Sequence, residues 1–386
     1  MARRIMSRTV RTRPRIAMLG AKHFLLRRGG GIEVVVHELT TRMAARGYEV
    51  TCYNRTGCDD GSTEEKAVVA QKVYRGVRVK YAPTIHSKGL AAVSSSVFAA
   101  LCTAFGDYDV VHFHAEGPCA MLWLPKLRGK RCIATIHALD HQRSEKWGSF
   151  ARAYLLFGER VAARCADEVI VLSENAQAYF KNTYDRETVF IPNGAARPQI
   201  YDAELICERF GLQKDAYILF VGRLVPEKGL RILLEAFSQV KTDKRLVLAG
   251  GASDSEAFVR ELRAMAKDDE RVLFTDFVQG QVLAELYSNA YAFVLPSNVE
   301  GMPLSLLEAM SYGNCCLTSD IPECAEVVED HAITFPKGSA EELKEKLQML
   351  CDSPRLVEGY RTGAADFICA KYNWDEVVEK TLELYE

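Results

Sequence analysis

The fold class is decided by residues 291–318, which read YAFVLPSNVEGMPLSLLEAMSYGNCCLT. The apolar run at 291–295 predicts a buried strand, and Pro303 and Gly313 predict the first residue of a helix and the residue just past its end. A second apolar run, 315–318, predicts another strand, so the adjacent Cys315 and Cys316 are expected to be strand core. A strand, a helix and a strand in this order are typical of a parallel α/β sheet.

Two acidic residues stand out in this stretch. Glu300 follows the first strand directly, and open α/β sheets bind ligands at the carboxyl ends of their strands. Glu308 falls in the second turn of a helix that is otherwise apolar, where a buried carboxylate needs hydrogen-bond donors. The alternative for Glu308 is an outward position on an amphipathic helix, and the helix pattern alone leaves both readings open.

The same alternation runs through the whole chain. At 386 residues the chain is too long for one typical core, so two domains are expected. A turn-rich segment at 191–198 marks the break between them, and residues 372–385 predict a terminal amphipathic helix. Further strands are predicted at 16–20, 48–53, 109–114, 131–137, 168–173, 216–221, 245–249 and 271–274. The sequence therefore predicts two doubly wound parallel sheets.

The charge is divided unevenly along the chain. The net charge is −2, but residues 1–200 carry 30 Lys and Arg against 18 Asp and Glu, which gives +12, and the remainder carries −14. The first fifteen residues hold six arginines and no acid. This tail is either a solvated segment or an overextended start before Met6, or it is a tether to anionic lipid. We expect no nucleic acid partner.

Composition places the chain among ordinary globular proteins, with 48% hydrophobic and 26% charged residues. The twelve cysteines form no C-x-x-C pair, and no run of about eighteen apolar residues is present. The absence of a secretory h-region favours a reduced, cytoplasmic location, with peripheral contact at the inner face of a membrane if the tail binds lipid.

Two loops carry candidate binding residues. Gly30 and Gly31 open the helix after the first strand, where backbone N–H groups favour anions. The pattern departs from G-x-G-x-x-G, because Val34 replaces the third glycine, so a nicotinamide site is disfavoured. Arg223 and Lys228 bracket the loop after strand 216–221, a natural place for two cations around a diphosphate. On their spacing alone, Arg223 and Lys228 could equally be surface cations in a polar loop.

The spacing Gly222-Arg223-x4-Lys228-Gly229 together with Glu300-x7-Glu308 resembles the retaining GT-B glycosyltransferases, in particular the large family 4. The connector at 191–194 and the terminal Trp374 segment are also similar to that family, so the resemblance covers the chain from the end of the arginine tail. It implies two Rossmann-like domains that face a central cleft. The implied division is an Arg-rich tail (1–14), an acceptor-binding domain (15–196), a nucleotide-sugar domain (197–370) and a C-terminal helix that crosses back onto the first domain (371–386).

The resemblance also implies roles for single residues. Arg223 and Lys228 would bind the donor diphosphate, and Glu308 would accept hydrogen bonds from the ribose hydroxyls. Glu300 would contact the transferred sugar, and His137 would lie close to it; the alternative for His137 is a strand-end histidine satisfied by its neighbours. The remaining implied donor contacts are Gly30, Gly31, Gly301, Met302 and Pro303, with Val278 at the base.

Features of the first domain resemble a subgroup that transfers hexoses or rhamnose in bacterial capsule and exopolysaccharide assembly. They are Gly30-Gly31-Ile32-Glu33 and the segment 137–143, HALDHQR, followed by Trp147-Gly148. Relatives are expected to read HGLDWQR, so Ala138 and His141 depart from the pattern on the side that faces the acceptor.

These implications lead to a metal-independent transfer of a sugar from a UDP- or dTDP-sugar to a glycan or lipid-linked acceptor. No cofactor or metal is expected, because the D-x-D at 107–109 opens a first-domain strand, away from the expected donor site. Two alternatives keep the fold: a nucleotide-sugar 2-epimerase, which would turn over donor without an acceptor, and a non-catalytic nucleotide-sugar-binding protein. Fold alone does not separate them.

Overall fold

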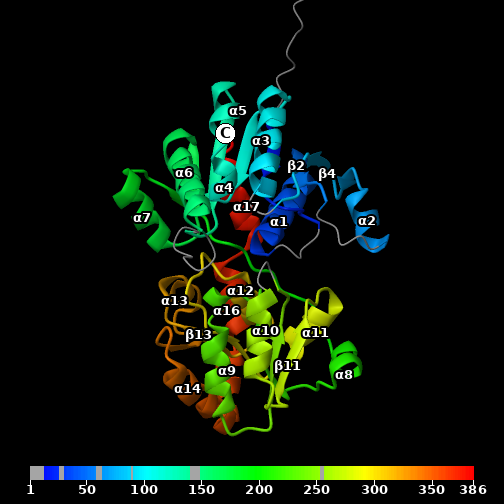
Figure 1. Ribbon diagram of the computed structural model, residues 1–386, viewed down its shortest axis with the longest axis vertical. Coiled ribbons are helices and arrows are strands. Elements are labelled where there is room, and N and C mark those ends of the chain that lie inside the picture. Colours follow the sequence, from blue (N-terminus) through cyan, green and yellow to red (C-terminus); the bar gives the residue numbers. More distant parts are fainter. Residues whose placement is uncertain (1–12, 26–29, 58–62, 88–89, 140–147, 253–255) are drawn as a thin grey trace, which may run out of the picture.

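The computed structural model describes residues 13–25, 30–57, 63–87, 90–139, 148–252 and 256–386. Four of the tail arginines and the segment 140–147, with His141 and Trp147, lie outside these ranges. Figure 1 shows two α/β domains stacked end to end, with the terminal helix lying in the first domain. Within the described ranges, no helix combines the length and the apolar character needed to cross a bilayer.

The first domain is built on an eight-stranded sheet in the order β3-β4-β2-β1-β5-β6-β7-β8. All neighbouring strands are parallel except the β3–β4 pair. The strands are β1 (Arg15–Leu19), β2 (Glu49–Arg55), β3 (Val73–Tyr74), β4 (Val77–Ala82), β5 (Val110–His114), β6 (Arg131–Ile136), β7 (Glu168–Val171) and β8 (Val189–Phe190). The helices are α1 (Gly31–Ala45), α2 (Thr63–Val69), α3 (Leu90–Phe105), α4 (Glu116–Cys119), α5 (Trp123–Leu127), α6 (Ser149–Cys165) and α7 (Glu174–Tyr184).

The second domain has a six-stranded, wholly parallel sheet in the order β11-β10-β9-β12-β13-β14. Its strands are β9 (Tyr217–Val221), β10 (Arg245–Ala249), β11 (Val272–Asp276), β12 (Ala292–Leu295), β13 (Cys316–Ser319) and β14 (Ile333–Phe335). Its helices are α8 (Leu205–Phe210), the 3₁₀ turn η3 (Pro226–Lys228), α9 (Leu230–Ser238), α10 (Glu256–Met265), α11 (Gln281–Asn289), α12 (Leu304–Ser311), α13 (Pro322–Val328), α14 (Ala340–Asp352), α15 (Pro354–Arg361) and α16 (Ala364–Lys371). The predicted doubly wound class is confirmed.

Both faces of the first sheet are buried, and the alternation along β1 shows how. Ala17 and Leu19 enter one apolar cluster, whereas Ile16 and Met18 enter another on the opposite face. The second cluster also contains Trp374 and Val378 of α17 (Trp374–Glu383). The terminal helix therefore covers one face of the first sheet beside α1, as the predicted crossing requires.

The two chain crossings between the domains lie side by side. The backbone N–H of Ala195 donates to the carbonyl of Tyr372 at 2.5 Å, and Ala195 forms a parallel bridge with Asn373. A Cβ added to Gly194 would lie 2.3 Å from the Trp374 ring, so the connector passes directly over the indole. The predicted connector and the start of the terminal helix are thus packed against each other.

Candidate active site

The central polar pair of the site joins two loops of the second domain. The strand order reverses between β9 and β12, so ligands are expected at the carboxyl ends of these two strands. Lys228 follows β9 at the end of η3, Glu300 follows β12, and the Lys228 Nζ lies 2.5 Å from the Glu300 Oε1. Ser297 Oγ donates to the same oxygen at 2.6 Å. With side chains only 13% and 8% exposed, lysine and glutamate form a largely desolvated ion pair.

Backbone packing fixes the two loops against each other. Gly229 has φ +68°, and a Cβ there would lie 1.9 Å from the carbonyl oxygen of Pro296. Any other residue would collide with backbone that cannot move aside as a side chain can. The glycine after Lys228 therefore allows the close approach that brings Lys228 to Glu300.

The first domain approaches these loops through the glycines that follow β1 and begin α1. A Cβ on Gly30 would lie 3.8 Å from Arg223 Nε, and one on Gly31 would lie 3.2 Å from Leu304 Cδ1. The glycine loop at the start of α1 thus lies across the cleft from the half-buried Arg223 and from the first turn of α12. Both cations predicted from the second domain stand near the boundary with the first.

The backbones of the two domains approach each other closely at Gly301. A Cβ on this residue would lie only 1.6 Å from the carbonyl oxygen of His137, so the two backbones are in direct contact. His137 and Glu300, the two candidate catalytic residues, consequently share one hollow at the domain boundary. Its lining comes from both domains: Ile136, His137, Ala138, Leu139, Leu172, Ser173, Ala176, Glu300, Gly301 and Glu323.

His137 is the last of three histidines that lie in a row. His114 Nδ1 and His137 Nε2 are 3.0 Å apart, and the rings of His112 and His114 stack with centroids 4.3 Å apart. His112 bonds to Thr135 Oγ1 at 2.7 Å and to Tyr385 OH at 2.6 Å. The row therefore links the end of the chain to the cleft.

Burial keeps these histidines neutral. It lowers the pKa of His112 to about 3 and that of His137 to about 4, and it holds the pKa of His114 well below its ordinary value. A neutral imidazole has one donor and one acceptor nitrogen. His137 can thus offer a hydrogen bond at the cleft, but not a positive charge at neutral pH.

The other second-domain residues take up distinct positions. Glu308 is half-buried, and Tyr287 OH donates to its Oε2 at 3.0 Å, so it is neither fully enclosed nor turned away from the protein. Asn193 Nδ2 donates to the carbonyl of Met302 at 3.2 Å, which fastens the loop before α12 to the connector. Pro303 caps α12, which begins at Leu304, one residue later than predicted. Val278 is buried directly beyond β11.

The carboxylates of the D-x-D lie away from this cleft. Asp107 and Asp109 of the D-x-D form ion pairs with Arg15 at the start of β1, the end of the sheet opposite the site. Within the described ranges, one group of side chains has the spacing to hold a metal ion: Glu329, Asp330 and His331. These residues follow α13, and the two acids are exposed.

Comparison with known families agrees with this arrangement in both halves of the chain. Residues 29–196 match the family model described as Glycosyltransferase Family 4, and residues 215–353 match the one described as Glycosyl transferases group 1. The chain belongs to glycosyltransferase family 4. The predicted family is thereby confirmed.

Individual relatives of this family 4 protein share its length and its fold. It is 28% identical to the D-inositol 3-phosphate glycosyltransferase of Xylanimonas cellulosilytica, with 96% of each chain covered. Sucrose-phosphate synthase from Thermosynechococcus elongatus superposes with a TM-score of 0.79 at 21% identity, over 97% of this chain and 98% of that one. Anabaena HepE in complex with UDP-glucose gives 0.78 at 17% identity, over 95% and 98%. The predicted GT-B fold is confirmed.

Sequence reasoning missed several partners of the predicted residues in this family 4 site. Ser297, Tyr287 and Asn193 bond to Glu300, Glu308 and the Met302 loop, and the sequence did not indicate these contacts. The sequence could have indicated that His114 lies near His137, because His114 ends a buried strand next to the strand that precedes His137.

Proposed function

We propose that this family 4 glycosyltransferase is a retaining, metal-independent enzyme that moves a hexosyl or rhamnosyl group from a UDP- or dTDP-sugar. One observation supports this most directly. Glu300, which is paired with Lys228 at the switch point of the second sheet, shares with His137 a hollow that both domains line. Such a site combines a cation for a leaving phosphate with polar groups for sugar hydroxyls.

The donor would bind with its diphosphate at Arg223 and Lys228 and the sugar toward Glu300. Lys228 would then exchange part of its contact with Glu300 for a phosphate oxygen, and Glu300 would accept a hydrogen bond from a sugar hydroxyl. Glu308, oriented by Tyr287, would receive the ribose hydroxyls, and backbone at Val278 would face the base. The glycine loop at Gly30 and Gly31 would close over the phosphates from the first domain.

Chemistry in this proposal needs no residue to form a covalent intermediate. The acceptor hydroxyl oxygen attacks the anomeric carbon on the face from which the phosphate departs. The anomeric C–O bond breaks with its electron pair passing to the phosphate oxygen, and that oxygen takes the acceptor proton. Arg223 and Lys228 stabilise the charge that develops on the phosphate. Neutral His137 donates a hydrogen bond at the sugar.

For the acceptor we propose a glycan or lipid-linked oligosaccharide of a capsule or exopolysaccharide pathway. The subgroup resemblance of the first domain supports it, although Ala138 and the replaced tryptophan at position 141 alter the acceptor side. The D-x-D carboxylates pair with Arg15 far from the cleft, which supports cations rather than a metal at the donor phosphates. The location proposed is cytoplasmic and peripheral at the inner face of the membrane.

The first experiment is a thermal-shift panel of nucleotide sugars and free nucleoside diphosphates with the purified chain. A ligand at a hundred times its Kd stabilises the folded state by about 2.7 kcal/mol, which is easily measured. We expect one nucleotide sugar to stand out, and that donor is then incubated with and without candidate acceptors. Product formed from the donor alone would identify an epimerase instead.

Variants separate binding from catalysis. Lys228→Ala should lower transfer about 10²–10³-fold, because it removes stabilisation of the leaving group. Glu300→Gln keeps the shape of the side chain and should lower transfer while the donor still raises the melting temperature. If both variants turn over like the wild type, the assigned roles are wrong. A wild-type chain that binds donor but transfers to no acceptor would support the non-catalytic alternative.

A further inference from the structure

Helix α3 exposes its bulky apolar residues to solvent, unlike an ordinary surface helix. Its sixteen residues contain no charged side chain. The face turned toward the protein is made of small residues, namely Ser95, Ser96, Ala99, Ala100, Thr103 and Ala104. An amphipathic helix normally buries its large apolar residues and exposes polar ones. Here the large apolar residues are on the solvent side.

These residues join others on a neighbouring helix. Phe98, Leu101 and Phe105 recur at the spacing of one helix face, and α3 packs against α5, which exposes Trp123 and Leu127. Phe105 is 74% and Leu127 76% exposed, so both side chains stand almost entirely in solvent. We call these five residues the α3–α5 face. Contiguous exposed apolar surface of this kind marks a protein or membrane interaction site.

Positive charge lies at one edge of the α3–α5 face. The Arg128 guanidinium lies over the Phe105 ring, 5.1 Å from its centroid, and Lys130 Nζ donates to the carbonyl of Gly106 at 3.0 Å. The acids that follow α3, Asp107 and Asp109, are both paired with Arg15. The neighbouring acids are therefore neutralised, and Arg128 stands at the edge of the apolar residues.

The sequence that precedes β1 is basic. Residues 1–12 carry four arginines and no acid, and they lead directly into Arg13 and then Arg15 at the start of β1. Arg15 contacts the two acids that immediately follow α3.

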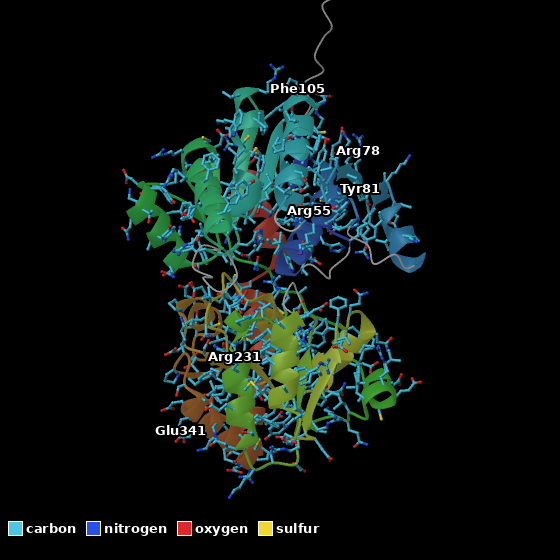
Figure 2. All side chains as sticks on the ribbon, in the orientation of Figure 1. Arg55, Arg78, Tyr81, Phe105, Arg231 and Glu341 are labelled. Atoms are coloured by element: carbon cyan, nitrogen blue, oxygen red, sulfur yellow. The ribbon has the colours of Figure 1, made fainter. Side chains whose placement is uncertain are left out.

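We propose that the α3–α5 face docks on an anionic phospholipid membrane. The exposed aromatic and leucine side chains would enter the boundary between headgroups and acyl chains, and Arg128 and Lys130 would contact the phosphates. A second copy of this chain fits less well, because association through this face would bring like charges together. Phe105 lies at the end of the first domain that points away from the second, so docking leaves the cleft uncovered (Figure 2).

Co-sedimentation with vesicles tests the proposal without any transferase assay. The full chain should bind vesicles of phosphatidylcholine mixed with phosphatidylglycerol, and bind phosphatidylcholine alone at least about tenfold more weakly. The double variant Phe105→Ser, Leu127→Ser should lose about tenfold or more of the binding to mixed vesicles. The matched control is Ile200→Ser, Met265→Ser, which changes two exposed apolar residues of the second domain and should bind like the wild type.

Three results would overturn the proposal. One is equal vesicle binding by the Phe105, Leu127 variant and the wild type. The second is loss of binding only when Arg3, Arg4, Arg8 and Arg11 are changed to Gln, which would assign attachment to the tail alone. The third is a wild-type dimer in sedimentation velocity that the Phe105, Leu127 variant converts to monomer, which would make the face a self-association surface. Donor binding by the same variants is unaffected in each case and reports separately on the proposed function.

Discussion

At the scale of single residues, Lys228 and Glu300 form a largely buried ion pair at the proposed donor site. Its two side chains are largely removed from water, so each charge depends on the other for compensation. Ser297 Oγ donates a further hydrogen bond to the Glu300 carboxylate. In the proposed function, a donor phosphate would supply Lys228 with a second anion.

We predict strong coupling between these two residues in a double-mutant cycle. Lys228→Met or Glu300→Gln alone should lower the free energy of unfolding by about 3 kcal/mol, because each leaves one buried group without its partner. The double variant should be destabilised by clearly less than the sum. Urea denaturation of the four proteins measures this, and strict additivity would contradict the pairing.

The sequence could place both of these residues but not their contact. Strand ends and loop glycines put Lys228 and Glu300 on the correct edge of the sheet, because that edge follows from strand direction alone. Their pairing spans 72 positions and depends on which strands are neighbours, which local patterns do not specify. Glu308 shows the same limit: its partner Tyr287 comes from a different helix.

At the scale of elements, long buried strands were predictable and short or exposed ones were not. The runs that became β9, β10 and β12 are continuously apolar, so their burial on both faces is visible in the sequence. β4 alternates buried Val77 and Val79 with exposed Arg78 and Lys80, near the edge of its sheet. β14 has only three residues, and both elements escaped prediction.

The histidine row between β5, β6 and the end of the chain predicts a dependence of stability on acid. His112 has a folded pKa of about 3 against 6.5 for the free side chain, so the unfolded chain binds its proton first. The stability that comes from keeping this histidine neutral is fully present above pH 6.5. As the pH falls below that value, the free energy of unfolding decreases by about 1.4 kcal/mol per pH unit for each such histidine. Denaturation of His112→Gln should therefore show a shallower loss between pH 7 and 5. Exposed His86→Gln should keep the wild-type slope.

The terminal helix is predicted to stabilise the whole chain through its first residue. Trp374 is buried, contacts Gly194 of the connector and joins the apolar cluster beneath β1. Trp374→Ala should lower the free energy of unfolding by about 3–5 kcal/mol, as for other large buried aromatic residues. Glu376→Ala, exposed on the same helix, should change it by less than about 0.5 kcal/mol. Equal effects in urea denaturation would show that the indole packing is not decisive.

At the scale of the whole molecule, the two domains touch on both sides of the hollow. Gly301 meets His137 on one side, and Asn175 of α7 donates to Glu323 of α13 at 2.9 Å on the other. The division of charge, +12 in the first half and −14 in the rest, suits such contact between domains as well as different partners for each. The two crossings of the chain between the domains are joined to each other by the Ala195–Tyr372 backbone hydrogen bond.

Gly301 should control how closely the domains meet. Gly301→Ala places a methyl group against the His137 carbonyl, a backbone group, so the domains must separate there while the core of each stays intact. Small-angle scattering should show a larger radius of gyration, and transfer should fall about 100-fold, because misplacement by about 1 Å is enough for such a loss. Gly359→Ala is the control, since its methyl group meets nothing within 4 Å. Unchanged scattering together with wild-type transfer in Gly301→Ala would show that this contact does not govern domain closure.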